Sequence, residues 1–135
     1  MAQLTIFFDR CTGSAVPKLL QNTRAPFIVE YQDDKKHGFA QDLADDKWLA
    51  EVSQKRWIVV SHDKRFHTDS IAIEAVRQHN GRVFYLDGGS SVKWDKLRRF
   101  AAAYKKIAAI VETEKPPFIY RVTYADRIIR VVKFK

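Results

Sequence analysis

The sequence predicts an α/β protein with a parallel central sheet that helices cover on both faces. Short apolar runs alternate with helical patterns along most of the chain, the order expected of strands joined by crossover helices. Several of these runs are apolar almost without interruption, as in strands that are buried on both faces. The chain has 135 residues, the length of one domain, so we expect a single domain over residues 1–135.

Four apolar runs are the expected strands of the parallel sheet. They are LTIFF at residues 4–8, FIVEY at 27–31, WIVVS at 57–61 and RVFYL at 82–86. A different pattern closes the chain, where FIYRVTYADRIIRVVKF alternates apolar and polar residues on either side of a YADR turn. This segment predicts a C-terminal β-hairpin with a basic face.

Helical patterns fill the gaps between these runs. A short helix is expected after the first strand, with Pro17 near its first turn. A second helix begins near Asp45, because three apolar residues then share one helix face: Trp48, Leu49 and Val52. Asp69 is the expected N-cap of a third helix. The longest helix is expected from Val92 to about Glu112.

The net charge of +8 is concentrated in the last third of the chain. Residues 1–92 hold 12 Lys and Arg against 12 Asp and Glu, whereas residues 93–135 hold 12 against 4, an excess of 8. A basic region attached to a neutral body indicates a polyanionic partner, most often nucleic acid. The alternative is a solvated basic face that serves only solubility.

Other classes of protein are disfavoured by simple features of the sequence. No stretch approaches the 18 or so apolar residues of a membrane span, so we expect no membrane partner. The first ten residues, MAQLTIFFDR, do not resemble a signal peptide, and we expect a cytoplasmic protein. A single cysteine, Cys11, excludes an internal disulfide and a cysteine-based zinc site, and we expect it to be a small buried residue.

Acidic residues follow three of the expected strands. Asp9, Asp63 and Asp87 come at the carboxyl ends of strands, and Asp45 opens a helix that starts from the same edge of the sheet. Carboxylates about 4 Å apart repel by roughly 1 kcal/mol in water and about 4 kcal/mol near a protein surface. A divalent cation such as Mg²⁺ or Mn²⁺ would offset that repulsion, so the sequence predicts a metal site.

Each of these residues also has a structural explanation. Asp45 and Asp69 could cap helices, Asp87 could serve the Gly-Gly turn after it, and Asp63 could lie in a loop. His62 could assist proton transfer, but an ordinary loop histidine is the simpler interpretation.

Short motifs around the acids resemble those of PIN domains, the nuclease fold of VapC-type toxins. The stretches are TIFFDR, DDKWLAEVSQKRWIVVSHDKRF and RVFYL. Asp9 matches the family's acid at the end of the first strand, and Asp45 matches its helix-opening acid. The segment from Ser61 to Phe66 matches its Thr/Ser-x-Asp-x-Asp-Phe motif, with Arg65 in place of the last Asp. The resemblance covers residues 3–90; the basic helix and hairpin of residues 92–135 lie outside it.

This resemblance implies a ribonuclease that depends on Mg²⁺ or Mn²⁺. Asp9, Asp45 and Asp63 would hold the metal, with Asp46 or Asp87 as candidates for a further ligand. The residues implied in phosphate and RNA binding are Arg10, Lys64 and Arg65. An antitoxin partner and a homodimer are also implied.

Two other classes of function are compatible with the sequence. One is a catalytically silent nucleic-acid-binding module of PIN-like fold, because the further acid that PIN toxins carry has no clear counterpart here. The other is a structural or partner-binding α/β protein whose acids only cap helices and stabilise turns.

Overall fold

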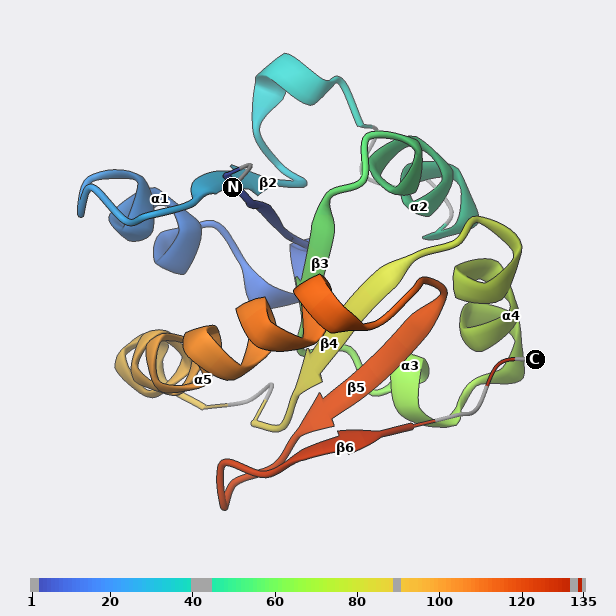
Figure 1. The fold of residues 1–135 in the computed structure, drawn as a ribbon. Coiled ribbons are helices and arrows are strands. Elements are labelled where there is room, and N and C mark those ends of the chain that lie inside the picture. Colours follow the sequence, from blue (N-terminus) through green and yellow to red (C-terminus); the bar gives the residue numbers. More distant parts are fainter. Residues whose placement is uncertain (1–2, 40–44, 89–90, 132–133, 135) are drawn as a thin grey trace.

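The protein forms a six-stranded, mostly parallel sheet between two layers of helices, which confirms the predicted fold class (Figure 1). The computed structural model describes residues 3–39, 45–88, 91–131 and 134. The strands lie in the order β2-β1-β3-β4-β5-β6, with only β6 antiparallel to its neighbour. Their bounds are β1 (Thr5–Phe8), β2 (Ile28–Tyr31), β3 (Ile58–Ser61), β4 (Arg82–Leu86), β5 (Phe118–Val122) and β6 (Ile128–Arg130).

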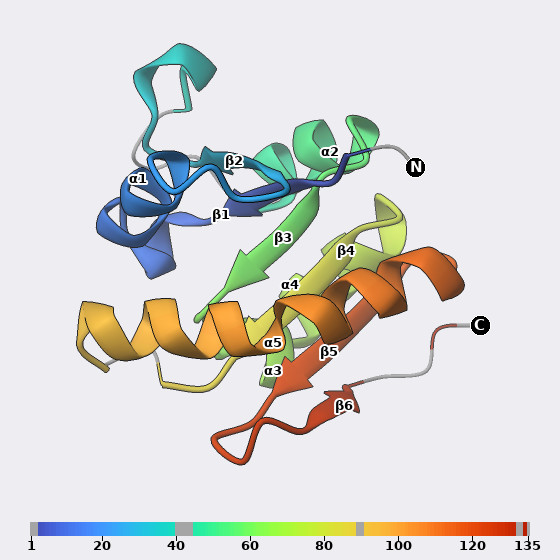
Figure 2. The same ribbon diagram turned by 60° about the vertical axis from the view of Figure 1, so that its left-hand side comes forward.

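Helices cover both faces of the sheet. α1 (Ala15–Gln21) and α5 (Lys93–Thr113) pack on one face, where α5 crosses the sheet in Figure 2. α2 (Asp45–Gln54), α3 (Arg65–Thr68) and α4 (Ser70–Gln78) pack on the other. Two 3₁₀ turns, η1 (Arg10–Thr12) and η2 (Lys35–His37), follow β1 and β2. None of the helices among the described residues has the length and hydropathy of a membrane-spanning segment.

Strand alternation divides the core into two clusters. Successive side chains of a strand point to opposite faces, so Ile6 and Phe8 of β1 pack toward α5 while Phe7 packs toward α2. On the α2 side, the predicted helix face is confirmed, because its three apolar residues are all at most 1% exposed: Trp48, Leu49 and Val52. Burying each such side chain contributes about 1.5–3 kcal/mol.

The C-terminal segment contributes more to the core than the sequence indicated. The predicted hairpin is present, but β5 is also the fifth parallel strand, paired with β4 from Arg82↔Phe118 to Leu86↔Val122. Four of its five residues are buried. The basic third of the chain is therefore built into the same sheet as the acidic residues.

Candidate acidic site at the carboxyl edge of the sheet

The register of the central strands brings Asp9 and Ser61 together. Phe8 of β1 is aligned with Val60 of β3, so the next residue on each strand, Asp9 and Ser61, also lie side by side. The strands continue to pair at this point, because the Asp9 backbone N–H donates to the Val60 carbonyl over 3.3 Å. The carboxyl ends of two neighbouring parallel strands thus place an acid beside a hydroxyl, as the sheet geometry predicts.

Asp9 is a buried acid held by three hydrogen bonds. The Ser61 hydroxyl donates to its Oδ2 over 2.6 Å, and the Thr12 backbone N–H and hydroxyl both donate to its Oδ1 over 3.2 Å. Burial raises the pKa of Asp9 from 3.8 to about 7, although the Ser61 and Thr12 hydrogen bonds lower it and the charge of Asp63 raises it further. A nearby cation would stabilise the ionised form of an acid in this position.

Ser61 connects Asp9 to Asp63. While its hydroxyl donates to Asp9, its oxygen accepts the Asp63 backbone N–H over 2.9 Å. One side chain therefore fixes both the buried carboxylate and the backbone that carries the second one. We call Asp9, Ser61 and Asp63 the acidic site.

Arg65 neutralises Asp63. Its Nε and Nη2 donate to Asp63 Oδ2 over 2.9 and 2.6 Å, and its backbone N–H donates to Oδ1 over 3.0 Å. Partial burial would raise the pKa of Asp63, but these hydrogen bonds and the Arg65 charge outweigh it, so the pKa lies below its usual value. The two acids therefore differ: among the described residues, Asp63 is stabilised as an anion by an internal cation, and Asp9 is not.

His62 belongs to the same hydrogen-bond network and is not an exposed loop histidine. Its side chain is buried, and its Nδ1 lies 3.1 Å from the Thr12 hydroxyl. The Thr12 hydroxyl therefore contacts both Asp9 and His62 and joins them in one network. Burial and the charges of Lys96 and Arg99 lower the pKa of His62 to about 4, so the ring is neutral at pH 7.

A cavity of about 630 Å³ opens beside Asp63, and we call it the site cavity. Its lining residues come from η1, the loop after β3, and β4 and β5 with the segments that follow them: Cys11, His62, Asp63, Lys64, Tyr85, Asp87, Gly88, Arg121 and Tyr124. The volume lies within the range of small-molecule binding sites. The predicted phosphate-binding residue Lys64 is exposed and lines this cavity.

Asp87, which also lines the site cavity, is paired with a cation. Arg121 Nε and Nη2 donate to its two carboxylate oxygens over 2.9 Å each. Arg99 donates from Nη1 to the Asp87 carbonyl over 2.6 Å. Asp87 follows β4, as predicted, but both of its carboxylate oxygens are engaged with Arg121, which makes it a weak candidate for an additional metal ligand.

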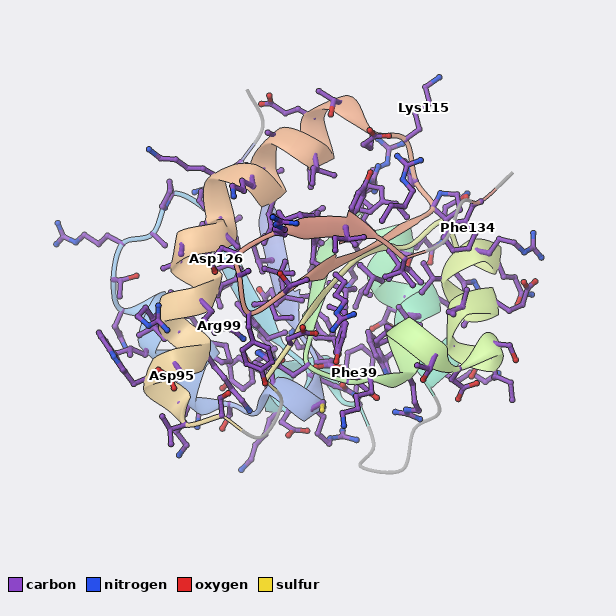
Figure 3. The ribbon with its side chains drawn as sticks, turned by 90° about the horizontal axis from the view of Figure 1, so that it is seen from below. Phe39, Asp95, Arg99, Lys115, Asp126 and Phe134 are labelled. Atoms are coloured by element: carbon purple, nitrogen blue, oxygen red, sulfur yellow. The ribbon has the colours of Figure 1, made fainter. Side chains whose placement is uncertain are left out.

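The long helix contributes cations near His62, one of the residues that line the site cavity. Lys96 and Arg99 lie in the first two turns of α5, and both act electrostatically on His62. Figure 3 views the molecule from below and shows Arg99 on α5 beside the strand ends. The acids of the first two thirds of the chain and the cations of the last third thus meet at one edge of the sheet.

The two neighbouring acids that open α2 are described unequally. Asp45 is the first residue of α2, on the same side of the sheet as Asp9 and Ser61, but its side chain lies outside the described residues. Asp46 is exposed and lines a second cavity of about 810 Å³ together with Arg65 and Asp69. The start of α2 is therefore close to Arg65. Asp69 caps α4, as predicted, by accepting the Ile71 N–H over 2.8 Å.

Arg10 and Cys11 lie in η1, directly after β1. Arg10 pairs through Nε with Asp33 over 2.7 Å and is not among the residues that line the site cavity. The expectation that Cys11 is buried is wrong, because the residue is exposed at the cavity wall. Partial burial of the thiol and the charges of Asp9 and Asp63 raise its pKa to about 11, so Cys11 is a poor nucleophile at neutral pH.

The donor set of the acidic site fits a hard divalent cation. Carboxylate oxygens are the ligands that Mg²⁺ and Mn²⁺ prefer. A cation would offset both the cost of burying the Asp9 carboxylate and its repulsion from Asp63. Elsewhere in the described part of the chain, three groups that could ligate a metal lie within 4.8 Å of one another: Glu30, Asp34 and His37. There, Lys36 already neutralises Glu30 over 3.0 Å.

The fold and this site define a three-layer α/β protein with acids and cations gathered at the carboxyl edge of a parallel sheet. A family model described as "PIN like domain" matches residues 4–88, more than half of the chain, and the chain therefore belongs to the PIN-like domain family. The chain is also 27% identical over 130 residues to a Mycobacterium tuberculosis (strain ATCC 25618 / H37Rv) protein named "Putative ribonuclease VapC45". That alignment covers 94% of this chain and 91% of the relative. No solved structure matches the chain significantly.

We predict that replacing Asp9 by Asn stabilises the metal-free protein increasingly as the pH rises. The folded protein keeps the Asp9 proton up to about pH 7, whereas the unfolded chain loses it near pH 4, so the wild type loses stability between these values. Three pKa units correspond to about 4 kcal/mol at most. His62 acts in the opposite direction below pH 6.5, because its pKa is lowered, but this contribution is common to both proteins.

Urea unfolding in EDTA at several values between pH 4 and pH 8 measures this effect. The free energy of unfolding of Asp9→Asn minus that of wild type should increase by about 2–4 kcal/mol over the range. A difference that stays constant with pH would mean that Asp9 is not a buried acid with a raised pKa.

Proposed function

We propose that the protein is a metal-dependent endoribonuclease, similar to the toxin of a VapBC-type toxin–antitoxin system. The observation that carries the proposal is the buried carboxylate of Asp9, linked through Ser61 to Asp63, at the strand ends of a PIN-like domain. The name of the Mycobacterium tuberculosis relative, which contains "ribonuclease", supports RNA as the substrate. The basic last third of the chain supports it independently, because it supplies cations for a polyanion.

In this proposal Asp9, Asp63 and Asp45 hold Mg²⁺ or Mn²⁺. The bound ion would supply Lewis acidity, lowering the pKa of a water molecule and stabilising the charge that develops on the phosphate. Asp9 would then stay ionised at neutral pH, because a cation favours the charged form of the acid. His62 is neutral, so it adds no positive charge that would repel the ion.

The cations around the site cavity would hold the RNA backbone. Lys64 and Arg121 line the cavity, and Lys96 lies close enough to lower the pKa of His62. Phosphate contacts of this kind position a substrate without reading its sequence. A cellular RNA substrate is consistent with a cytoplasmic protein, and the likeness to VapC extends the proposal to an antitoxin partner and a homodimer.

A catalytically silent RNA-binding module is the second candidate, and one observation favours it. Arg65 stands where the resemblance to the PIN-domain motif implies an Asp, and it engages both oxygens of Asp63. An internal cation in this place competes with a metal ion for the same carboxylate. The two candidates differ in whether the protein cleaves RNA.

We predict that wild-type protein cleaves RNA with Mg²⁺ or Mn²⁺ and not in EDTA. Asp9→Asn, Asp45→Asn and Asp63→Asn should each lower the cleavage rate by about 100-fold or more, because each removes a charged oxygen ligand. The measurement is the initial rate on a fluorescently labelled RNA, together with circular dichroism to verify folding.

Asp69→Asn is the matched control for these variants. Asn caps helices as well as Asp does, so the variant should fold and cleave like wild type. Asp46→Asn should lower the cleavage rate less than Asp45→Asn does, since Asp46 is exposed. Cleavage that all three site variants retain would contradict the metal-site assignment. Tight, salt-sensitive RNA binding without any cleavage would favour the silent module.

We also predict that Arg65→Ala lowers the Mn²⁺ concentration needed for half-maximal cleavage by about fivefold. The variant removes the cation that competes for Asp63, so the carboxylate becomes available to the metal. Lys64→Ala is the matched control, because it removes a neighbouring charge that makes no hydrogen bond to Asp63 among those described. This variant should weaken RNA binding and leave unchanged the Mn²⁺ midpoint, which is the Mn²⁺ concentration at half-maximal cleavage. An unchanged or higher Mn²⁺ midpoint in Arg65→Ala would show that Arg65 does not compete with the metal.

A further inference from the structure

We propose that Tyr124 and Arg99 form a stacking site for one unpaired nucleobase of RNA, at the rim of the site cavity. The inference rests on the proposed function, since it takes RNA to be the molecule that enters this cavity. Both residues lie beyond residue 88, outside the segment that the family model matches. The stacking site is therefore a feature of the C-terminal part of this chain.

Tyr124 has the position and exposure that a stacking residue needs. It lies in the turn between β5 and β6 and lines the site cavity with Asp63 and Arg121. Although it is a large aromatic residue, 67% of it is exposed. Exposed aromatic rings beside cations are where the bases of single-stranded nucleic acids stack, because every base has a flat face and every linkage carries a charge.

Arg99 covers one face of the Tyr124 ring. Its guanidinium carbon lies 4.1 Å from the ring centroid, a cation–π contact. Arg99 is only 6% exposed, and its Nη1 is fixed by the Asp87 carbonyl at 2.6 Å, while its Nη2 has no hydrogen-bond partner in the described structure. Since the guanidinium occupies one side of the ring, the solvent-exposed area belongs to the other face and the edge. A base would complete a stack of guanidinium, phenol ring and base.

Gly88 keeps this arrangement compact. A Cβ at Gly88 would lie 2.7 Å from Ser91 Oγ, 3.0 Å from Arg99 Nη1 and 3.4 Å from Tyr124 Cε1. Its φ of +95° also favours glycine. The strand end, the start of α5 and the hairpin turn therefore pack closely around one residue without a side chain. A ring held in this way loses little conformational entropy when a base stacks on it.

The surroundings of Tyr124 suit a nucleotide rather than a purely apolar partner. Lys64 and Arg121 line the same cavity and can meet the phosphates next to the stacked base. Asp63 of the acidic site lines the same cavity, so a base on Tyr124 would place a neighbouring phosphodiester in the cavity that this acid faces. A purely structural role, in which Tyr124 only holds the hairpin against α5, uses the face toward Arg99 and leaves the exposed face without a function.

The test measures RNA binding by the full chain in EDTA, where no cleavage occurs. The probes are short single-stranded RNAs that carry the fluorescent base 2-aminopurine at each position in turn, and matched RNAs with an abasic site at that position. We expect wild type to quench 2-aminopurine at one position. Tyr124→Ala should abolish that quenching and weaken binding about 10-fold, while Tyr124→Phe should preserve both. Wild type should bind the abasic RNA about 10-fold more weakly than the intact RNA. Tyr124→Ala should bind the abasic RNA no more weakly than the intact RNA.

Trp94→Ala is the matched control. Trp94 is 68% exposed on the first turn of α5 but does not line the site cavity, so its loss should change binding less than twofold. Equal quenching and affinity in wild type and Tyr124→Ala would overturn the stacking site. The same conclusion would follow if Trp94→Ala lost as much quenching and affinity as Tyr124→Ala. If Tyr124 governs quenching but wild type cleaves no RNA with metal, the nuclease proposal fails and the stacking site stands. If wild type cleaves RNA and Tyr124→Ala binds normally, the stacking site fails alone.

Discussion

The hydroxyl of Ser61 is the contact on which the candidate site depends. It donates to the buried carboxylate of Asp9 and accepts the backbone N–H of Asp63, so it orients two acids that repel each other. The contact exists because β1 and β3 are adjacent parallel strands in a register that ends both of them at the same level. Without it, Asp9 would lose its shortest hydrogen bond while remaining buried, which is costly for a charged group. The central pair of strands therefore determines the site as well as the core.

Around this contact the molecule keeps positive charge close to negative charge. Arg65 pairs with Asp63 and Arg121 pairs with Asp87, whereas the hydrogen-bond donors to Asp9 in the described part of the chain are all neutral. Asp9 is thus the acid that an additional cation would stabilise most. The neutral first part of the chain and its basic last part meet at this edge. The reason is that β5 and α5 place cations beside the strand ends where the acids lie. We propose that this mixed edge receives a metal ion and a phosphate together.

Much of this arrangement could be predicted from the sequence. Uninterrupted apolar runs identified β1, β3 and β4, and the rule for parallel sheets placed Asp9, Asp63 and Asp87 at one edge. The cap at Asp69 was also predictable, since it depends only on local sequence. Contacts between distant segments were not, because nothing local marks them: Thr12 with His62, Arg99 with Tyr124, and the pairing of β5 with β4. The expectation that Cys11 is buried was wrong for a similar reason. Its exposure depends on how the 3₁₀ turn η1 packs beside the site cavity.

The most direct test of the acidic site is a titration with Mn²⁺, followed by electron paramagnetic resonance of the free ion. We expect wild type to bind Mn²⁺, and Asp9→Asn and Asp63→Asn each to bind it at least about 10-fold more weakly, because each loses a charged oxygen ligand. Asp69→Asn should bind like wild type, since Asp69 only caps α4. Equal Mn²⁺ binding by wild type and both site variants, or no binding by wild type, would contradict the claim that these acids form a cation site.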